Sequence, residues 1–82
     1  MNNSYRFTFT ATCPSDGKTI IYRLEIHTDR MLPVEHIRTA ISQFKSGYHE
    51  DIADALSEML PGEQTLVATH QGVEVETVRE GK

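Results

Sequence analysis

The chain has 82 residues, of which 38% are hydrophobic, so we expect one small folded domain spanning residues 1–82. Twelve Asp and Glu residues against eight Lys and Arg give a net charge of −4, which disfavours direct binding to nucleic acid. The single cysteine, Cys13, excludes an intramolecular disulfide, and no apolar run reaches signal-peptide length or the roughly 18 residues of a membrane span; we therefore expect a cytoplasmic protein without membrane contact.

The N-terminal part of the chain predicts a β-hairpin. Residues 5–12 and 20–27 both alternate between apolar and other side chains, the period of a half-buried strand. The sequence Pro14-Ser15-Asp16-Gly17 between them is typical of a turn. A turn centred on this sequence makes the apolar faces of the two strands coincide. The expected register opposes Ala11 to Ile20, Phe9 to Tyr22, Phe7 to Leu24, Tyr5 to Ile26 and, on the other face, Arg6 to Glu25 and Thr12 to Thr19.

Two short helices are predicted in the middle of the chain. The first begins at Pro33, a favourable first helical residue, and stops at Ser46-Gly47. The second begins near Tyr48 or His49 and ends at Pro61-Gly62. With so short a connection, the helices are expected to be antiparallel neighbours. Their predicted apolar stripes are Val34, Ile37, Ile41 and Phe44, with Ala40 beside them, and Ile52, Ala55, Leu56, Met59 and Leu60.

A second hairpin is predicted at the C-terminus, with strands over residues 64–70 and 73–79 around a turn at Gln71-Gly72. Its expected register opposes His70 to Val73 and Ala68 to Val75. The complete order is ββααββ, which predicts an α+β fold: a four-stranded antiparallel sheet with two antiparallel helices packed on one face and an ordered core of about residues 5–79.

This order of elements resembles the tunnelling-fold unit of pterin and purine enzymes, in which two helices also lie between two pairs of antiparallel strands. The resemblance concerns the order of elements alone. The chain has no clustered histidines like those of the zinc-binding members of that family, so the resemblance implies no activity and no residue roles.

No set of residues forms a catalytic, cofactor-binding or metal-binding motif. The four histidines have no metal-ligand spacing and are interpreted as solvent-exposed or edge residues: His27, His36, His49 and His70. Ser15 and Ser42 lack a matching histidine and acid, and Cys13 has no neighbouring base in this fold. We therefore expect no enzymatic activity, no cofactor and no metal.

Two surfaces remain as candidates for binding. The second helix carries an acidic stripe at Asp51, Asp54 and Glu58, for which a solvated helix face is the simpler interpretation and a docking surface for a basic partner the functional one. The outer face of the sheet has few charges for a solvent-exposed surface, which favours self-association. Its candidate residues are Thr8, Thr10, Ile21, Arg23, Val67 and Val78.

The sequence therefore leads to the hypothesis of a small non-catalytic protein-binding or regulatory protein that is a homodimer through its sheet. One alternative is an inhibitor of phage or mobile-element type that uses the acidic helix against a nucleic-acid-binding enzyme. Another is a tunnelling-fold-like enzyme with a site between subunits. The identity of the partner protein does not follow from the sequence.

Overall fold

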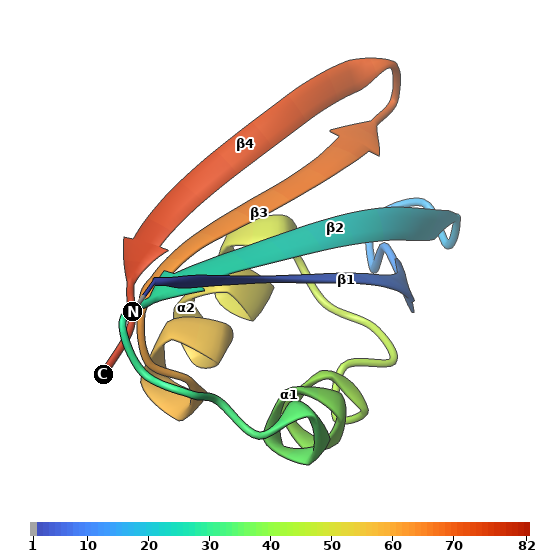
Figure 1. The fold of residues 1–82 in the computed structure, drawn as a ribbon. Helices are drawn as coiled ribbons and strands as arrows, with labels where there is room; N and C mark the ends of the chain where they lie inside the picture. Colours follow the sequence, from blue (N-terminus) through green and yellow to red (C-terminus); the bar gives the residue numbers. More distant parts are fainter. Residues whose placement is uncertain (1) are drawn as a thin grey trace.

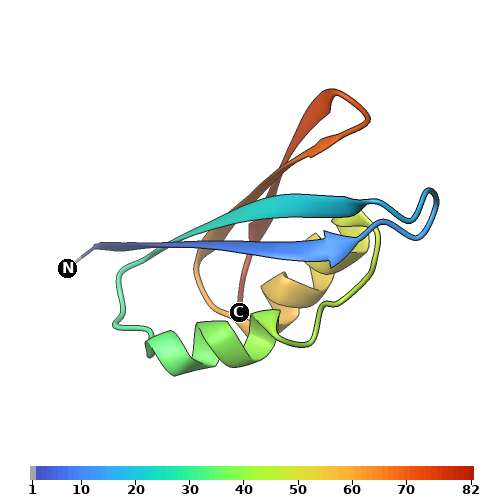
Figure 2. The same cartoon turned by 90° about the vertical axis from the view of Figure 1, so that its right-hand side faces the viewer.

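The computed structural model describes residues 2–82 and contains one four-stranded antiparallel sheet with both helices on the same side (Figures 1 and 2). The strands follow the sheet order β1-β2-β3-β4. The predicted α+β fold with the order ββααββ is confirmed. Its elements are β1 (Asn3–Thr12), β2 (Thr19–Thr28), α1 (Val34–Ile41), α2 (His49–Met59), β3 (Glu63–His70) and β4 (Val73–Glu80).

Both predicted hairpin registers are confirmed. In the first hairpin, Phe9 pairs with Tyr22 and Arg6 with Glu25, and the ladder ends at Thr12 and Thr19. In the second, β3 and β4 are joined by Gln71-Gly72, whose φ angles of 51° and 83° are both positive, as a two-residue type I′ turn requires. The turn residues and the two-residue alternation together therefore determined the pairing.

The sheet extends slightly further than the expected core. β1 begins at Asn3, and β4 ends at Glu80. The last two residues are also held, because Gly81 N donates to Gly62 O at 2.7 Å and Lys82 N donates to Leu60 O at 3.2 Å. The C-terminus thereby closes against the segment that links α2 to β3.

The core lies between the helices and the inner face of the sheet. Figure 2 shows the chain running along α1 in one direction and returning along α2, with both helices below β1 and β2. The largest fully buried side chains come from β2, α2 and β3: Tyr22, Ile26, Leu56 and Leu66. The two strands joined through the helical segment, β2 and β3, therefore form the centre of the sheet and of the core.

The helical stripes differ from the prediction at their margins. α1 ends at Ile41, so Phe44 lies beyond the helix and is only partly buried, and Val34 is exposed. In α2 the buried side includes Ala53, whereas Met59, which we placed on the apolar stripe, is exposed. The short helices therefore leave part of the apolar surface along β1 only partly covered.

The helices also fail to cover the far end of the second hairpin. In Figure 1 the turn joining β3 and β4 projects beyond α2, and Val73 beside that turn is exposed although its position was predicted to face the core. Within residues 2–82, neither helix has the length and apolarity needed to cross a membrane.

Candidate functional site on the outer face of the sheet

The outer face is the side of the sheet turned away from α1 and α2. The strand registers align its residues in rows that run across the sheet. One row contains Arg6, Glu25, Thr65 and Val78, and the next contains Thr8, Arg23, Val67 and Glu76. Thr10 and Ile21 are paired in the adjacent row. The structure therefore brings all six predicted self-association residues together on one face.

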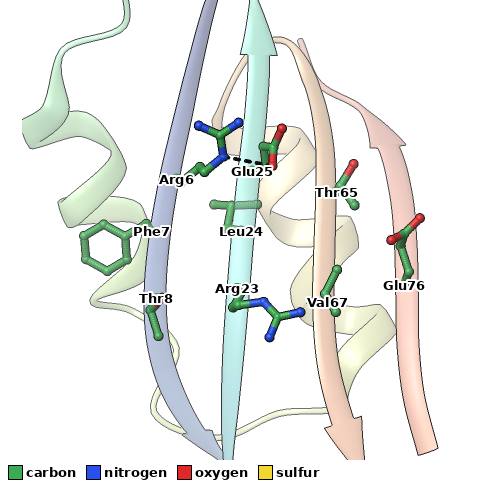
Figure 3. Close-up of a pocket in the computed structure, with 9 residues that line it drawn as sticks. All are labelled: Arg6, Phe7, Thr8, Arg23, Leu24, Glu25, Thr65, Val67 and Glu76. Carbon is green, nitrogen blue, oxygen red and sulfur yellow. Dashed lines mark hydrogen bonds and ion pairs between the residues drawn. The ribbon is translucent and has the colours of Figure 1, made fainter.

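This face is hollowed around the second row. A concavity of about 360 Å³ lies over the middle of the sheet. Figure 3 shows Arg6 and Glu25 toward one end, with Arg23, Val67 and Glu76 across the middle. Phe7 points sideways from β1 instead, toward the α1 side of the molecule (Figure 3). The hollow is thus lined by charged residues of both signs around one valine, with threonines between them.

Most of the charged groups around the hollow are already paired. Arg6 Nε lies 3.1 Å from Glu25 Oε1, and Arg23 Nη2 lies 3.7 Å from Glu74 Oε2. Burial alone would raise the pKa of Glu25, but the hydrogen bond and charge of Arg6, helped by His27, hold it below its usual value. Glu25 is therefore a charged acceptor at neutral pH. Among the described residues that line the hollow, only Glu76 is a charged residue without an ion pair within 4 Å.

The acidic stripe of α2 is exposed but partly neutralised. Asp51, Asp54 and Glu58 all lie on the solvent side of the helix. Arg79 of β4 reaches this surface, with its Nε 2.8 Å from Asp54 Oδ1 and its Nη2 3.6 Å from Glu50 Oε1. The arginine therefore ties α2 to the edge of the sheet and reduces the negative charge that the stripe presents.

A cluster of aromatic and imidazole rings lies on the opposite, inner face of the sheet, and it was missed in the sequence. His49 is only 8% exposed, so its interpretation as a solvated or edge histidine is wrong. Its Nδ1 lies 2.9 Å from His70 Nε2, and its own Nε2 is buried without a hydrogen-bond partner among residues 2–82. Tyr22 packs against both imidazole rings with centroid separations of 5.5 and 5.8 Å.

Burial lowers the pKa of His49, and the nearby His70 lowers it further. The pKa of the Tyr22 hydroxyl is raised, mainly because the residue is buried, and this hydroxyl also has no hydrogen-bond partner in the described part of the chain. A signal for His49 did exist, because it precedes Ile52 by three positions and Ala53 by four on the buried side of α2. Within residues 2–82, no three His, Cys, Asp or Glu side chains converge as a metal site would require.

Comparisons of the chain with protein-family models, with curated proteins and with solved structures gave no match.

Proposed function

We infer that this protein acts by binding another protein through the outer face of its sheet, without catalysis of its own, and that it self-associates through the same sheet as a homodimer. The observation that carries the proposal is the hollow over the middle of the sheet. Ile21, 61% exposed, and Val78, 51% exposed, lie on the same face and extend its apolar surface.

The electrostatics of this face favour its coverage by a partner. Removing apolar surface from water contributes about 25 cal/mol per Å² in favour of association, before the entropic costs of binding, whereas burying an unpaired charge opposes association. Arg6 and Arg23 already have carboxylate partners within the chain. A partner can therefore cover them without leaving an isolated positive charge.

The same arrangement specifies the chemistry of the partner. Glu76 lines the hollow beside Val67 on the neighbouring strand. A complementary segment would place an apolar side chain over Val67 and a lysine or arginine against Glu76. The lowered pKa of Glu25 keeps this carboxylate ionised and paired with Arg6 at neutral pH.

Affinity capture from the native host tests the proposal when two double variants are compared. Ile21→Glu/Glu76→Lys changes two exposed residues of the outer face, and Asp51→Lys/Glu58→Lys changes two exposed residues of α2. We expect partners captured by the wild type to be lost with the first variant and retained with the second. The reverse result would replace the proposal with the acidic-helix inhibitor, and capture unchanged by both variants would refute both surfaces.

A further inference from the structure

The free edge of β1 offers a second copy of the chain a place to pair. Thr12 N donates to Lys45 O at 2.9 Å, and Thr12 O accepts from Gly47 N at 3.1 Å, so the backbone groups of Thr12 point away from β2. Successive residues of a strand point their N–H and C=O groups to opposite sides. The N–H and C=O groups of the other even-numbered residues of β1 therefore also point away from β2. These residues are Ser4, Arg6, Thr8 and Thr10, and no strand formed by residues 2–82 lies beside β1 on that side.

The length of this edge is limited at both ends. The segment from Lys45 to Gly47 covers the edge at Thr12, where Ser46 forms an isolated parallel bridge with the strand. At the other end the strand begins at Asn3. The free backbone groups therefore run from Ser4 to Thr10, and their midpoint is Phe7.

We propose that two copies pair antiparallel along β1, with the two-fold axis at Phe7, to form one continuous eight-stranded sheet. This inference deepens the proposed function, on which it rests, by assigning the self-association to one edge. In this register Ser4 lies opposite Thr10 of the second copy and Arg6 lies opposite Thr8. Each such pair exchanges two backbone hydrogen bonds, so every free backbone group of the edge is used.

Other registers use the edge less completely. An axis at Thr8 would set Ser4 opposite Thr12, whose N–H already donates to Lys45 O and whose carbonyl already accepts from Gly47 N. An axis at Arg6 would set two arginines directly opposite each other. The register centred on Phe7 is therefore favoured for two reasons: the backbone groups of Thr12 are already bonded, and two copies of Arg6 would repel each other.

The side chains of the Phe7 register are compatible on both faces. On the outer face Arg6, already paired with Glu25, meets a threonine and not a like charge. On the inner face Phe7 meets Phe7 of the second copy, and Tyr5 meets Phe9. Tyr5 and Phe7 are only partly buried in one copy and border an apolar groove of about 230 Å³ between β1 and α1. Val34 of α1, 55% exposed, lines the same groove, which the second copy would cover.

The opposite edge of the sheet is unsuited to self-pairing. β4 carries Glu74, Glu76 and Glu80 on its outer face, so two copies of β4 would bring acidic side chains together. Pairing β1 of one copy with β4 of another would leave a free edge at each end and produce larger assemblies. Association through β1 alone instead closes at the dimer.

The experiment measures the dimer Kd by sedimentation equilibrium for the wild type and two proline variants. Thr8→Pro removes a free-edge N–H at the centre of the proposed interface, and Glu74→Pro is the matched change on the β4 edge; circular dichroism checks that both variants fold. We expect a wild-type dimer whose Kd rises about tenfold or more in Thr8→Pro and stays unchanged in Glu74→Pro. A strictly monomeric wild type, a Thr8→Pro variant with wild-type Kd, or assemblies larger than a dimer would overturn the inference.

Single cysteines in a Cys13→Ser background test the register without proline. Phe7→Cys would place the two Cα atoms about 4.5 Å apart across a non-hydrogen-bonded pair, within disulfide range. In Thr8→Cys the two cysteines would lie diagonally, with Cα atoms about 7 to 8 Å apart, too far to bridge. An intersubunit disulfide in the first variant alone supports the Phe7 axis, and one in the second alone overturns it.

The two proposals can fail separately. If Ile21→Glu/Glu76→Lys abolishes the dimer and partner capture while Thr8→Pro abolishes neither, the edge inference falls and the outer-face function stands. If Thr8→Pro abolishes the dimer while Ile21→Glu/Glu76→Lys captures every wild-type partner, the edge inference stands and the outer-face binding site falls.

Discussion

Replacing His49 with phenylalanine should make the stability of this protein less sensitive to acid. In the folded state burial and His70 lower the pKa of His49, so the buried ring stays neutral. Its position as the first residue of α2 adds to this, because the helix N-terminus disfavours a positive charge. The Leu66 backbone and Glu50 favour the charged ring and Arg79 opposes it, but each of these effects is smaller than those of burial and His70.

The sign and size of the effect follow from proton linkage. Between the lowered folded-state pKa and the unfolded value of about 6.5, the unfolded chain binds a proton at His49 that the folded chain does not. Neutral His49 therefore makes its full contribution to the free energy of unfolding of the wild type above a pH of about 6.5. The wild type loses this contribution as the pH falls, until the folded-state pKa is reached. The slope for one proton is at most about 1.4 kcal/mol per pH unit, or roughly 6 to 11 °C in Tm for a domain of this size.

At alkaline pH the same variant should differ little from the wild type. Removing the contact between His49 Nδ1 and His70 Nε2 costs about 0.5 to 1.5 kcal/mol, whereas removing the unpartnered Nε2 recovers about 1 to 3 kcal/mol. These opposing contributions are of similar size.

Thermal and urea unfolding of the wild type, His49→Phe and His36→Gln between about pH 5 and pH 8 checks this prediction. His36 is exposed on α1, so its replacement controls for the loss of a histidine elsewhere. The wild type and His36→Gln should lose stability together below pH of about 6.5, while His49→Phe should lose less. An equal loss in all three proteins would refute the role assigned to His49.

Four further substitutions test the local geometry, each by urea unfolding at neutral pH. Tyr22→Phe removes a buried hydroxyl that has no hydrogen-bond partner among residues 2–82, so it should leave stability unchanged or raise it by up to about 1 kcal/mol. A loss of stability above about 2 kcal/mol would indicate a hydrogen bond that the structure lacks. Gly62→Ala should destabilise the fold by more than about 2 kcal/mol, because the added Cβ would lie 2.6 Å from the His27 carbonyl oxygen. The control Gly17→Ala places no atom within 4 Å of its Cβ and should cost about 1 kcal/mol. Equal costs for the two variants would contradict this prediction. Gln71→Asn should stabilise the second hairpin by several tenths of a kcal/mol, since asparagine suits the positive φ of 51° there, and a lower urea midpoint would be contrary evidence.

The parts of the fold that depend on short-range rules could be predicted from the sequence. The hairpin pairing of Phe9 with Tyr22 follows from the turn and from the parity of the strands, both of which lie within a few residues. The same alternation along the strands predicted which residues lie on the outer face. Their placement on one surface was therefore available before the structure, although the hollow around Val67 was not, because it depends on the shape of the whole sheet.

The parts that depend on the docking of distant segments could not be predicted. His49 is buried because the start of α2 lies against His70 at the end of β3, a contact between residues 21 positions apart in the chain. The hydrogen bonds that close the free edge of β1 at Thr12 depend on the path of residues 45–47, which no local sequence pattern specifies. Both features arise when the helical segment packs on the sheet, and periodicity alone does not fix how it packs.

The small size of the domain connects its stability with the proposed pairing of β1. A chain of this length buries only roughly 60 to 68% of its unfolded surface, so additional burial has a large relative effect. Tyr5 and Phe7 are among the hydrophobic residues that the core covers only partly, and both lie on β1. Because a dimer stabilises the folded state by mass action, wild-type Tm should rise with protein concentration and Thr8→Pro should lose this dependence. Differential scanning fluorimetry over a hundredfold range of concentration would show this, and a concentration-independent wild-type Tm would argue that β1 remains an unpaired edge.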